Sequence, residues 1–280
     1  MVYARCFGDF QEVVVADNCA LFVNGVFENY QTLDGSTLFL GAFFFTIQIY
    51  GDFSGYSDIA IGCARLFGID LMQNFKYPYF SRDIAEFWRR WHISLTTWFR
   101  DYIYIPLGGS RAGKWKSFRN TLVIFLVSGF WHGANWTFVA WGAYHALLFL
   151  PLLLLGQNRR YRDSVAENSF LPSVKELTQM GATFLLVLLG WILFRSEDIS
   201  QAAVYLERMF NVSLFSAPQL VGLGFGQLLL KKCFFFTALM FVVEWIGRKQ
   251  AHVDDRGPEP SGSVCYLYGI ADYHLWFRRQ

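Results

Sequence analysis

The sequence predicts an all-α, multi-pass integral membrane protein, and three observations support this fold class. Only 16% of the 280 residues are charged and 54% are hydrophobic, whereas soluble domains carry about 25% charged residues. Aromatic residues make up 19% of the chain, and Trp and Tyr concentrate where a bilayer meets water. Residues 121–155 contain no charged side chain, a run longer than one membrane crossing requires.

The first part of the chain predicts helices at and in the membrane. Residues 1–34 are moderately polar, and we expect a helix at the membrane surface. Residues 36–50 and 57–69 predict two membrane helices or half-helices. We expect an irregular joint between them at 51–55, because glycines and Asp52 interrupt the apolar run there.

Residues 83–104 predict a helix that lies in the membrane interface. Asp83 can cap its start, and Glu86 three residues later completes a capping box. Aromatic residues stand next to arginines along this segment, which suits a helix with its rings inward and its guanidinium groups toward lipid headgroups. The surrounding segment 76–119 is the densest basic run of the chain, so positive-inside counting places it on the cytoplasmic side.

The uncharged stretch 121–155 would extend about 52 Å as one straight helix, but the hydrocarbon core of a bilayer is only about 30 Å thick. We therefore expect two passes, or one pass and a re-entrant piece, with a break near 129–136. The loop 156–176 is also basic, and it lies on the same side as 76–119 only if 121–155 forms a hairpin. Further membrane helices are expected at 177–194, 212–230 and 233–247, within a domain spanning 1–247 that precedes a polar, divergent tail at 248–280.

Composition and spacing argue against several other classes of protein. The net charge of +2 is too small to indicate a nucleic-acid partner. The five cysteines are scattered without a CxxC pair, so we expect free thiols rather than disulfides or a zinc site. The five histidines show no metal-ligand spacing, and we predict neither a metal nor a bound cofactor. The first residues do not resemble a signal peptide.

The most informative polar residue of the uncharged stretch is His132, because an ionisable group at membrane depth indicates a functional site. An imidazole can accept and return a proton near neutral pH. Gly129 and Gly133 would let a backbone or a substrate approach closely, and Asn135 could hold the imidazole tautomer or stabilise an oxyanion. The alternative is a structural histidine, hydrogen-bonded to a neighbouring helix. The residues predicted to exclude water from this site are Trp131 and Trp136.

A second histidine, His92, lies beside Arg89 and Arg90 in the basic run. The two arginines attract anions, so this cluster could bind the phosphates of an acyl donor such as acetyl-CoA. Contact with anionic lipid headgroups explains the same residues equally well. Both interpretations stay open from the sequence.

A third candidate group consists of Asp52, Ser54 and Tyr56, which could line a polar cavity for a glycan. Pairing of the carboxylate with an arginine of the next segment is the more conservative interpretation, because buried charges need partners. His145 follows His132 by 13 residues, about 20 Å along an ideal helix. We expect it to share a site with His132 only if the chain folds back.

Several segments, in order, resemble the membrane-bound O-acyltransferases, in the branch of alginate O-acetylation proteins. The resemblance runs from about residue 8 to residue 210, and its motifs are long and specific. They are 48–62 (QIYGDFSGYSDIAIG), 74–79 (NFKYPY), 86–95 (EFWRRWHISL), 99–109 (FRDYIYIPLGG), 129–136 (GFWHGANW) and 190–195 (GWILFR).

The resemblance implies transfer of acetyl groups from acetyl-CoA or a related donor to hydroxyls of an exported or cell-envelope polysaccharide. It implies that His132 is the catalytic histidine and that His92 is the second histidine of the site. It also implies a bacterial inner-membrane protein, a ring of helices around a central tunnel, and a periplasmic acetyltransferase- or esterase-like partner. Family members are nearly twice as long, so we expect an N-terminally truncated member with an incomplete ring.

Other functions fit the same residues. A D-alanyl transfer protein acting on teichoic acid differs mainly in its donor, which arrives on a carrier protein. A glycan channel or scaffold would use the tunnel without proton transfer by His132. An inactive fragment is the third alternative.

Overall fold

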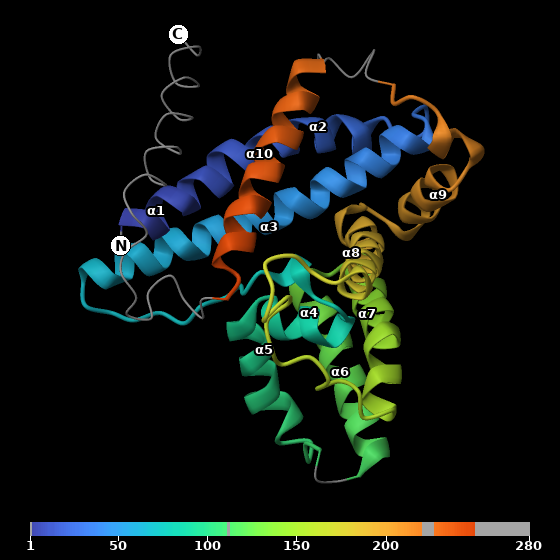
Figure 1. Ribbon diagram of the computed structural model, residues 1–280. Helices are drawn as coiled ribbons and strands as arrows, with labels where there is room; N and C mark the ends of the chain where they lie inside the picture. The colour runs from blue at the N-terminus through green and yellow to red at the C-terminus, as the bar shows by residue number, and fades with distance from the viewer. Residues whose placement is uncertain (1, 111–112, 220–226, 250–280) are drawn as a thin grey trace. The chain divides into compact units, whose positions relative to one another are not determined.

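A computed structural model describes residues 2–110, 113–219 and 227–249 of the chain, and Figure 1 traces them. All regular secondary structure among these residues is helical, which confirms the all-α prediction for the described part. The chain divides into two compact units. Unit 1 contains Met1–Asn29, Phe43–Asn74 and Pro218–Gln280, and unit 2 contains Tyr30–Ala42 and Phe75–Ala217.

Unit 1 packs three helical segments through aromatic rings. Helix α1 (Val2–Asp9) continues through a π-helical turn (Phe10–Ala16) into α2 (Asp17–Glu28), and α3 (Gly35–Leu66) and α10 (Gln227–Gly247) are the other two segments. The ring of Phe44 on α3 lies 5.5 Å from Phe22 on α2 and 5.0 Å from Phe234 on α10. Such ring pairs contribute about 0.5–1.5 kcal/mol each beyond the area that they bury.

Helix α3 is continuous through residues 51–55, so the joint predicted there is wrong. A Cβ atom on Gly51 would lie 2.9 Å from the carbonyl oxygen of Gln11, and one on Gly55 would lie 2.7 Å from that of Gly8. These glycines therefore admit a neighbouring backbone instead of ending the helix. The sequence pattern alone does not distinguish these two uses of glycine.

Unit 2 is built on a helical hairpin formed by α6 (Lys114–His132) and α7 (Trp136–Leu154). The two helices touch backbone to backbone, because a Cβ atom on Gly129 would collide with the carbonyl of Phe138, and one on Gly142 with that of Phe125. The three residues between the helices confirm the break predicted near 129–136. Because α6 and α7 form a hairpin, the start of α6 and the end of α7 lie at the same end of the pair. The two basic segments, 76–119 and 156–176, can lie on the same side of a membrane only with such a hairpin.

Helices α8 (Val174–Arg195) and α9 (Ile199–Met209) complete unit 2. Ser173 and Glu176 form a capping box at the start of α8. Further along, the hydroxyl of Tyr205 donates to the carbonyl of Leu38 at 2.7 Å, and the backbone N–H of Gly35 donates to Ser213 Oγ at 2.9 Å. These bonds tie the first turns of α3, which belong to unit 2, to α9 and the turn after it.

The predicted interfacial helix 83–104 consists of three short pieces: α4 (Ile84–Arg90), α5 (Ile93–Phe99) and a π-helical turn (Arg100–Tyr104). The prediction of a cap is confirmed, because the Asp83 carboxylate accepts a hydrogen bond from the N–H of Glu86 at 2.7 Å. The prediction of one helix is wrong, because His92 adopts a left-handed backbone conformation between α4 and α5.

The remaining helix predictions have different outcomes. The segment 177–194 corresponds to α8 and 233–247 to α10. Of the helix expected at 212–230, the beginning is wrong, because Val212–Phe215 form a 3₁₀ turn, whereas 227–230 belong to α10 and 220–226 lie outside the described residues. Most of the predicted tail, from residue 250 onward, lies outside the described residues.

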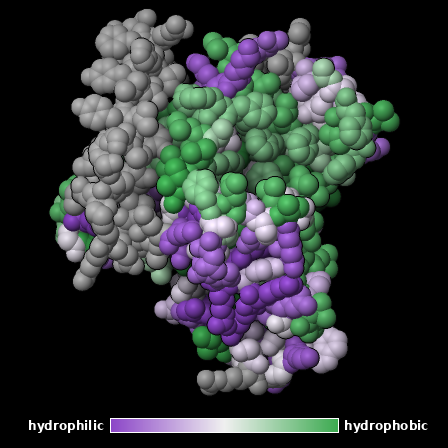
Figure 2. All heavy atoms as spheres, viewed as in Figure 1, coloured by the Kyte–Doolittle hydropathy of each residue, from purple (hydrophilic) through white to green (hydrophobic). Residues whose placement is uncertain are grey.

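Two of the described helices, α7 and α8, are long and apolar enough to cross a membrane. Figure 2 shows that hydrophilic side chains gather over the part of unit 2 where, in Figure 1, the loop 155–173 runs across α4. The loop end of the α7–α8 pair is therefore polar, while the body of these helices is apolar.

Candidate functional site

The structure places His132 at the last residue of α6, directly before the turn of the hairpin. Its imidazole is enclosed by rings from three segments. The ring centroids of Trp131, Trp141 and Phe194 lie 5.0, 5.3 and 5.1 Å from it, and all three rings stand nearly perpendicular to the imidazole. No described residue makes a hydrogen bond or an ion pair with the His132 side chain. The predicted alternative, a histidine hydrogen-bonded to a neighbouring helix, is therefore not found among these residues.

The side chain of Asn135 caps a helix in this structure, and its catalytic role stays a prediction. Its side-chain oxygen accepts a hydrogen bond from the N–H of Thr137 at 3.1 Å, and its amide nitrogen donates to the carbonyl of Glu197 at 2.6 Å. Asn135 is thus the N-cap of α7 and ties the hairpin turn to the corner after α8. Because the helix breaks after His132, Asn135 does not lie one helical turn beyond the imidazole.

The two tryptophans predicted to exclude water differ in their surroundings. Trp131 contacts the imidazole of His132, although 58% of its surface is exposed. Trp136 is 76% exposed. The water-excluding walls are instead Trp141, which is 1% exposed, and Phe194 of α8. A hairpin centred at 133–135 implies that residues just after the break return beside 125–132, so Trp141 could have been found from that signal.

His92 lies in the same unit, at the break between α4 and α5. Its φ of 44° and ψ of 57° are left-handed values, which cost a side chain other than glycine about 1–2 kcal/mol. The imidazole is close enough to His132 for an electrostatic interaction between the two rings. The structure therefore brings together the two histidines that the sequence singled out, and backbone strain marks one of them.

His145 is the buried polar residue that sequence reasoning set aside. The chain does fold back, and the ring of Trp141 lies between the two histidines, 5.3 Å from His132 and 5.2 Å from His145. His145 is fully buried, and neither of its ring nitrogens has a hydrogen-bond partner. Its imidazole packs against the backbone of Gly190, where a Cβ atom would lie 2.6 Å from Nε2.

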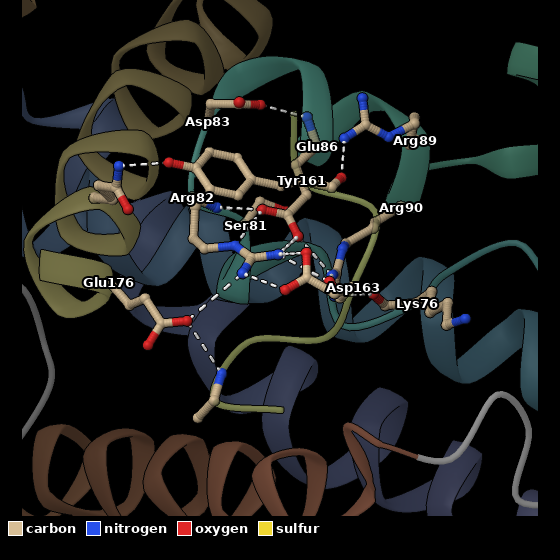
Figure 3. Close-up of polar contacts among 12 residues, drawn as sticks. Lys76, Ser81, Arg82, Asp83, Glu86, Arg89, Arg90, Tyr161, Asp163 and Glu176 are labelled. Atoms are coloured by element: carbon tan, nitrogen blue, oxygen red, sulfur yellow. Dashed lines mark hydrogen bonds and ion pairs between the residues drawn. The ribbon is translucent and has the colours of Figure 1, made fainter. Parts of the chain in front are cut away.

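The arginines predicted to bind substrate, Arg89 and Arg90, are the last two residues of α4, and both are bonded within the chain (Figure 3). Arg89 donates to the carbonyls of Asn158 and Tyr161. Arg90 donates to the Glu86 carboxylate at 2.6 Å. Both side chains thus hold the loop after α7 against α4, and their binding of an acyl donor stays a prediction.

At the centre of this polar cluster, Arg82 pairs with three carboxylates (Figure 3). Its guanidinium lies 3.0 Å from Glu86, 3.2 Å from Asp163 and 3.5 Å from Glu176. The side chains of Arg82 and Glu86 are only 3% and 1% exposed. Burial alone would raise the pKa of Asp163, but the hydrogen bond from Arg82, the charge of Arg82 and backbone hydrogen bonds together outweigh this and lower that pKa below its usual value.

The third predicted group belongs to unit 1. Ser54 donates its hydroxyl to the carbonyl of Tyr50 within its own helix at 2.7 Å, and Tyr56 is 64% exposed. No arginine among the described residues forms an ion pair with Asp52, so the expected structural pairing is not seen. That these residues bind a glycan stays a prediction.

The structure shows the state of the cysteines and of possible metal ligands for the described residues only. Cys6, Cys19, Cys63 and Cys233 are free thiols, as predicted, and Cys265 lies outside the described residues. Within the described ranges, no three His, Cys, Asp or Glu side chains are grouped so that they could hold a metal ion.

Comparison with known proteins adds to this geometry. A profile of the membrane-bound O-acyltransferase family matches residues 23–164, about half of the chain. The chain is 40% identical over 228 residues to a probable alginate O-acetylase, AlgI, of Pseudomonas aeruginosa, covering 80% of this chain and 42% of that protein. It is 37% identical over 206 residues to a peptidoglycan O-acetyltransferase of Helicobacter pylori, covering 74% of this chain and 38% of that protein.

A shorter match joins the chain to a teichoic acid D-alanyltransferase of Streptococcus thermophilus, with 40% identity over 108 residues, or 36% of this chain and 26% of that protein. The chain thus spans less than half the length of each of these three relatives. The family profile includes His92, His132 and the hairpin between α6 and α7. The chain belongs to the membrane-bound O-acyltransferase family.

Proposed function

We propose that this protein transfers acetyl groups to hydroxyls of an exported or cell-envelope polysaccharide of the alginate type, with His132 as the general base. The observation that supports this most concerns the imidazole of His132. Aromatic rings surround it, and no described residue forms a hydrogen bond with it. The names of the alginate and peptidoglycan relatives support the acetyl group and the polymer acceptor.

In the proposed reaction, Nε2 or Nδ1 of His132 accepts the proton of the attacking hydroxyl. The hydroxyl oxygen forms a bond to the acetyl carbonyl carbon, the thioester C–S bond breaks, and the leaving thiolate takes up the proton that His132 accepted, which returns the imidazole to its neutral form. Acetyl-CoA or a related thioester is the donor. His92, which interacts electrostatically with His132, would position one of these groups.

The setting that we propose is the bacterial inner membrane, crossed several times, with the helices of the complete protein in a ring around a tunnel. A periplasmic acetyltransferase- or esterase-like protein would complete transfer to the polymer. Trp131 is a candidate for contact with the acceptor, because it is exposed beside His132.

Replacing His132 by Gln at the native locus tests the proposal. We expect at least a hundredfold loss of polysaccharide acetyl groups, in keeping with the usual contribution of a general base, and an unchanged amount of protein in the membrane. Alkaline release and quantification of acetate from purified polymer measures the first, and immunoblotting of membranes the second. Normal acetylation in this variant contradicts the proposal and favours a channel or scaffold.

The second candidate function is D-alanyl transfer to teichoic acid, supported by the match to the Streptococcus thermophilus relative. It uses the same histidine with a different donor. Mass spectrometry of the group released by alkali separates the two functions, because acetate and D-alanine differ in mass.

A further inference from the structure

We infer that Trp141 is a positioning residue for His132, and that the face of its indole stabilises the protonated imidazole where a carboxylate does so in many acyl-transfer sites. This inference rests on the proposed function, because it takes His132 as the base.

The first step concerns the polar partners of His132. In a Ser-His-Asp triad, a buried carboxylate fixes the orientation of the histidine and stabilises the imidazolium that forms during the reaction. His132 has no such partner among the described residues. The stretch 121–155 around it contains no carboxylate in its sequence at all.

The second step concerns which ring holds the imidazole. Three rings lie within 5.3 Å of it, but they differ in how firmly they are held. Trp131 is 58% exposed, whereas Trp141 is 1% exposed. Trp141 is stacked on Trp191 at 5.8 Å and meets the ring of Trp88 at 5.6 Å. Trp141 is therefore fixed by its own neighbours and can fix the imidazole in turn.

The third step concerns charge. When His132 accepts a proton, a cation forms in an uncharged part of a membrane protein, where an unpaired charge is costly. A cation within about 6 Å of an aromatic ring is attracted by its π face, and Trp is the strongest of the three aromatic residues in this respect. An indole also carries no charge of its own, so it is cheaper to bury at membrane depth than a carboxylate would be.

A pair of variants at position 141 tests the π face separately from the filling of space. Trp141→Phe keeps an aromatic face, and Trp141→Met fills a similar volume without one. In permeabilised cells of the native host supplied with labelled acetyl-CoA, we expect Trp141→Met to lower kcat about tenfold, in the range of cation–π effects, with the KM for acetyl-CoA unchanged. Trp141→Phe should recover most of the lost kcat.

Phe149→Met is the control, because the ring of Phe149 on α7 meets that of Phe125 and has no ring contact with Trp141 or His132 among the described residues. It should leave kcat within about twofold of the wild type. Equal kcat for the Phe and Met variants at position 141, when both reach the membrane in wild-type amounts, overturns the inference. So does a change confined to KM.

The outcome for His132→Gln separates this inference from the proposed function. If His132→Gln is inactive and Trp141→Met is fully active, only the role of Trp141 is wrong. If His132→Gln keeps its activity, the base assignment is wrong, and the inference is overturned with it.

Discussion

At the N-terminal end of α8, the guanidinium of Arg82 is surrounded by three carboxylates, whereas at the C-terminal end the imidazole of His132 is surrounded by three aromatic rings. At the first end, Arg82 and Arg90 are paired with carboxylates, and hydrogen bonds from Arg82 and Arg89 hold the loop 155–173 on α4. The second end leaves its ionisable group without a polar partner among the described residues. The difference indicates that ion pairs stabilise the fold of unit 2 at one end, whereas aromatic rings alone surround the ionisable group at the other.

The largest effect on stability is expected around Arg82, where the ion pairs lie. Glu86→Ala removes the buried carboxylate that binds both Arg82 and Arg90, and breaking a buried pair typically costs about 3–5 kcal/mol. Thermal unfolding of the detergent-solubilised protein measures this loss. Asp101→Ala is the control, because its pair with Arg100 is exposed and exposed ion pairs contribute little to stability. A similar loss of stability in both variants would contradict the expectation that the buried ion pairs stabilise the fold more than the exposed pair does.

The next prediction concerns the strained backbone of His92, between α4 and α5. His92→Gly should raise the free energy of unfolding by about 1 kcal/mol, because glycine adopts the left-handed conformation without the steric cost. The same variant should lower acetylation, since it removes the second imidazole. His92→Ala keeps the strain and loses the imidazole, so it should lower acetylation without the gain in stability. If His92→Gly unfolds at a lower temperature than His92→Ala, the strain is not present in the folded protein.

A smaller effect is expected at His145. His145→Phe removes two buried nitrogens that have no partner, which relieves a cost of about 1–3 kcal/mol, while the larger ring adds a packing cost of similar size. We expect thermal unfolding to stay close to that of the wild type. His145→Gln, which keeps unpaired polar atoms, should be less stable than His145→Phe. If His145→Gln were more stable than His145→Phe, the imidazole nitrogens would form hydrogen bonds in the folded protein.

The smallest effect is the pH dependence contributed by Asp163. Because its pKa is lower in the folded protein than in the unfolded chain, its carboxylate stabilises the fold above the unfolded pKa of about 3.9. That contribution is lost as the pH falls through the lower, folded value. The difference in stability between wild type and Asp163→Asn should be below about 1 kcal/mol at neutral pH and should vanish in acid. Unfolding curves at several pH values test this, and a difference that grows in acid contradicts it.

The sequence predicted the hairpin and the importance of His132 because both follow from simple limits. An uncharged run of 35 residues is too long for one crossing, and an ionisable group within it is unusual. The sequence did not predict the continuous α3, because glycines at 51 and 55 carry the same signal whether they break a helix or admit another backbone. It did not predict the strained turn at His92, because that conformation depends on the packing of α4.

The candidate site was predicted less completely than the fold. Position in the chain identified His132 and His92, and the structure brings them into one unit. Trp141 and Phe194 were missed as ring contacts of His132, and His145 as a contact of Trp141, because these contacts depend on how α7 and α8 pack. Arg89 and Arg90 were chosen for their charge, but intrachain carbonyls and Glu86 occupy them. Charge alone does not show whether an arginine binds a ligand or its own chain.

The close backbone contact between α6 and α7 has a consequence for the synthesis of the protein. The hairpin depends only on residues close in sequence, so it can form as soon as α7 is complete. Phe194, which closes one side around His132, follows the histidine by 62 residues. At about 5–20 residues per second, the nascent chain carries His132 for roughly three to twelve seconds before that ring is made. During this interval the imidazole of His132 lies at the tip of a newly formed hairpin, and the chain contains this imidazole before it contains the ring of Phe194 that closes one side of its surroundings.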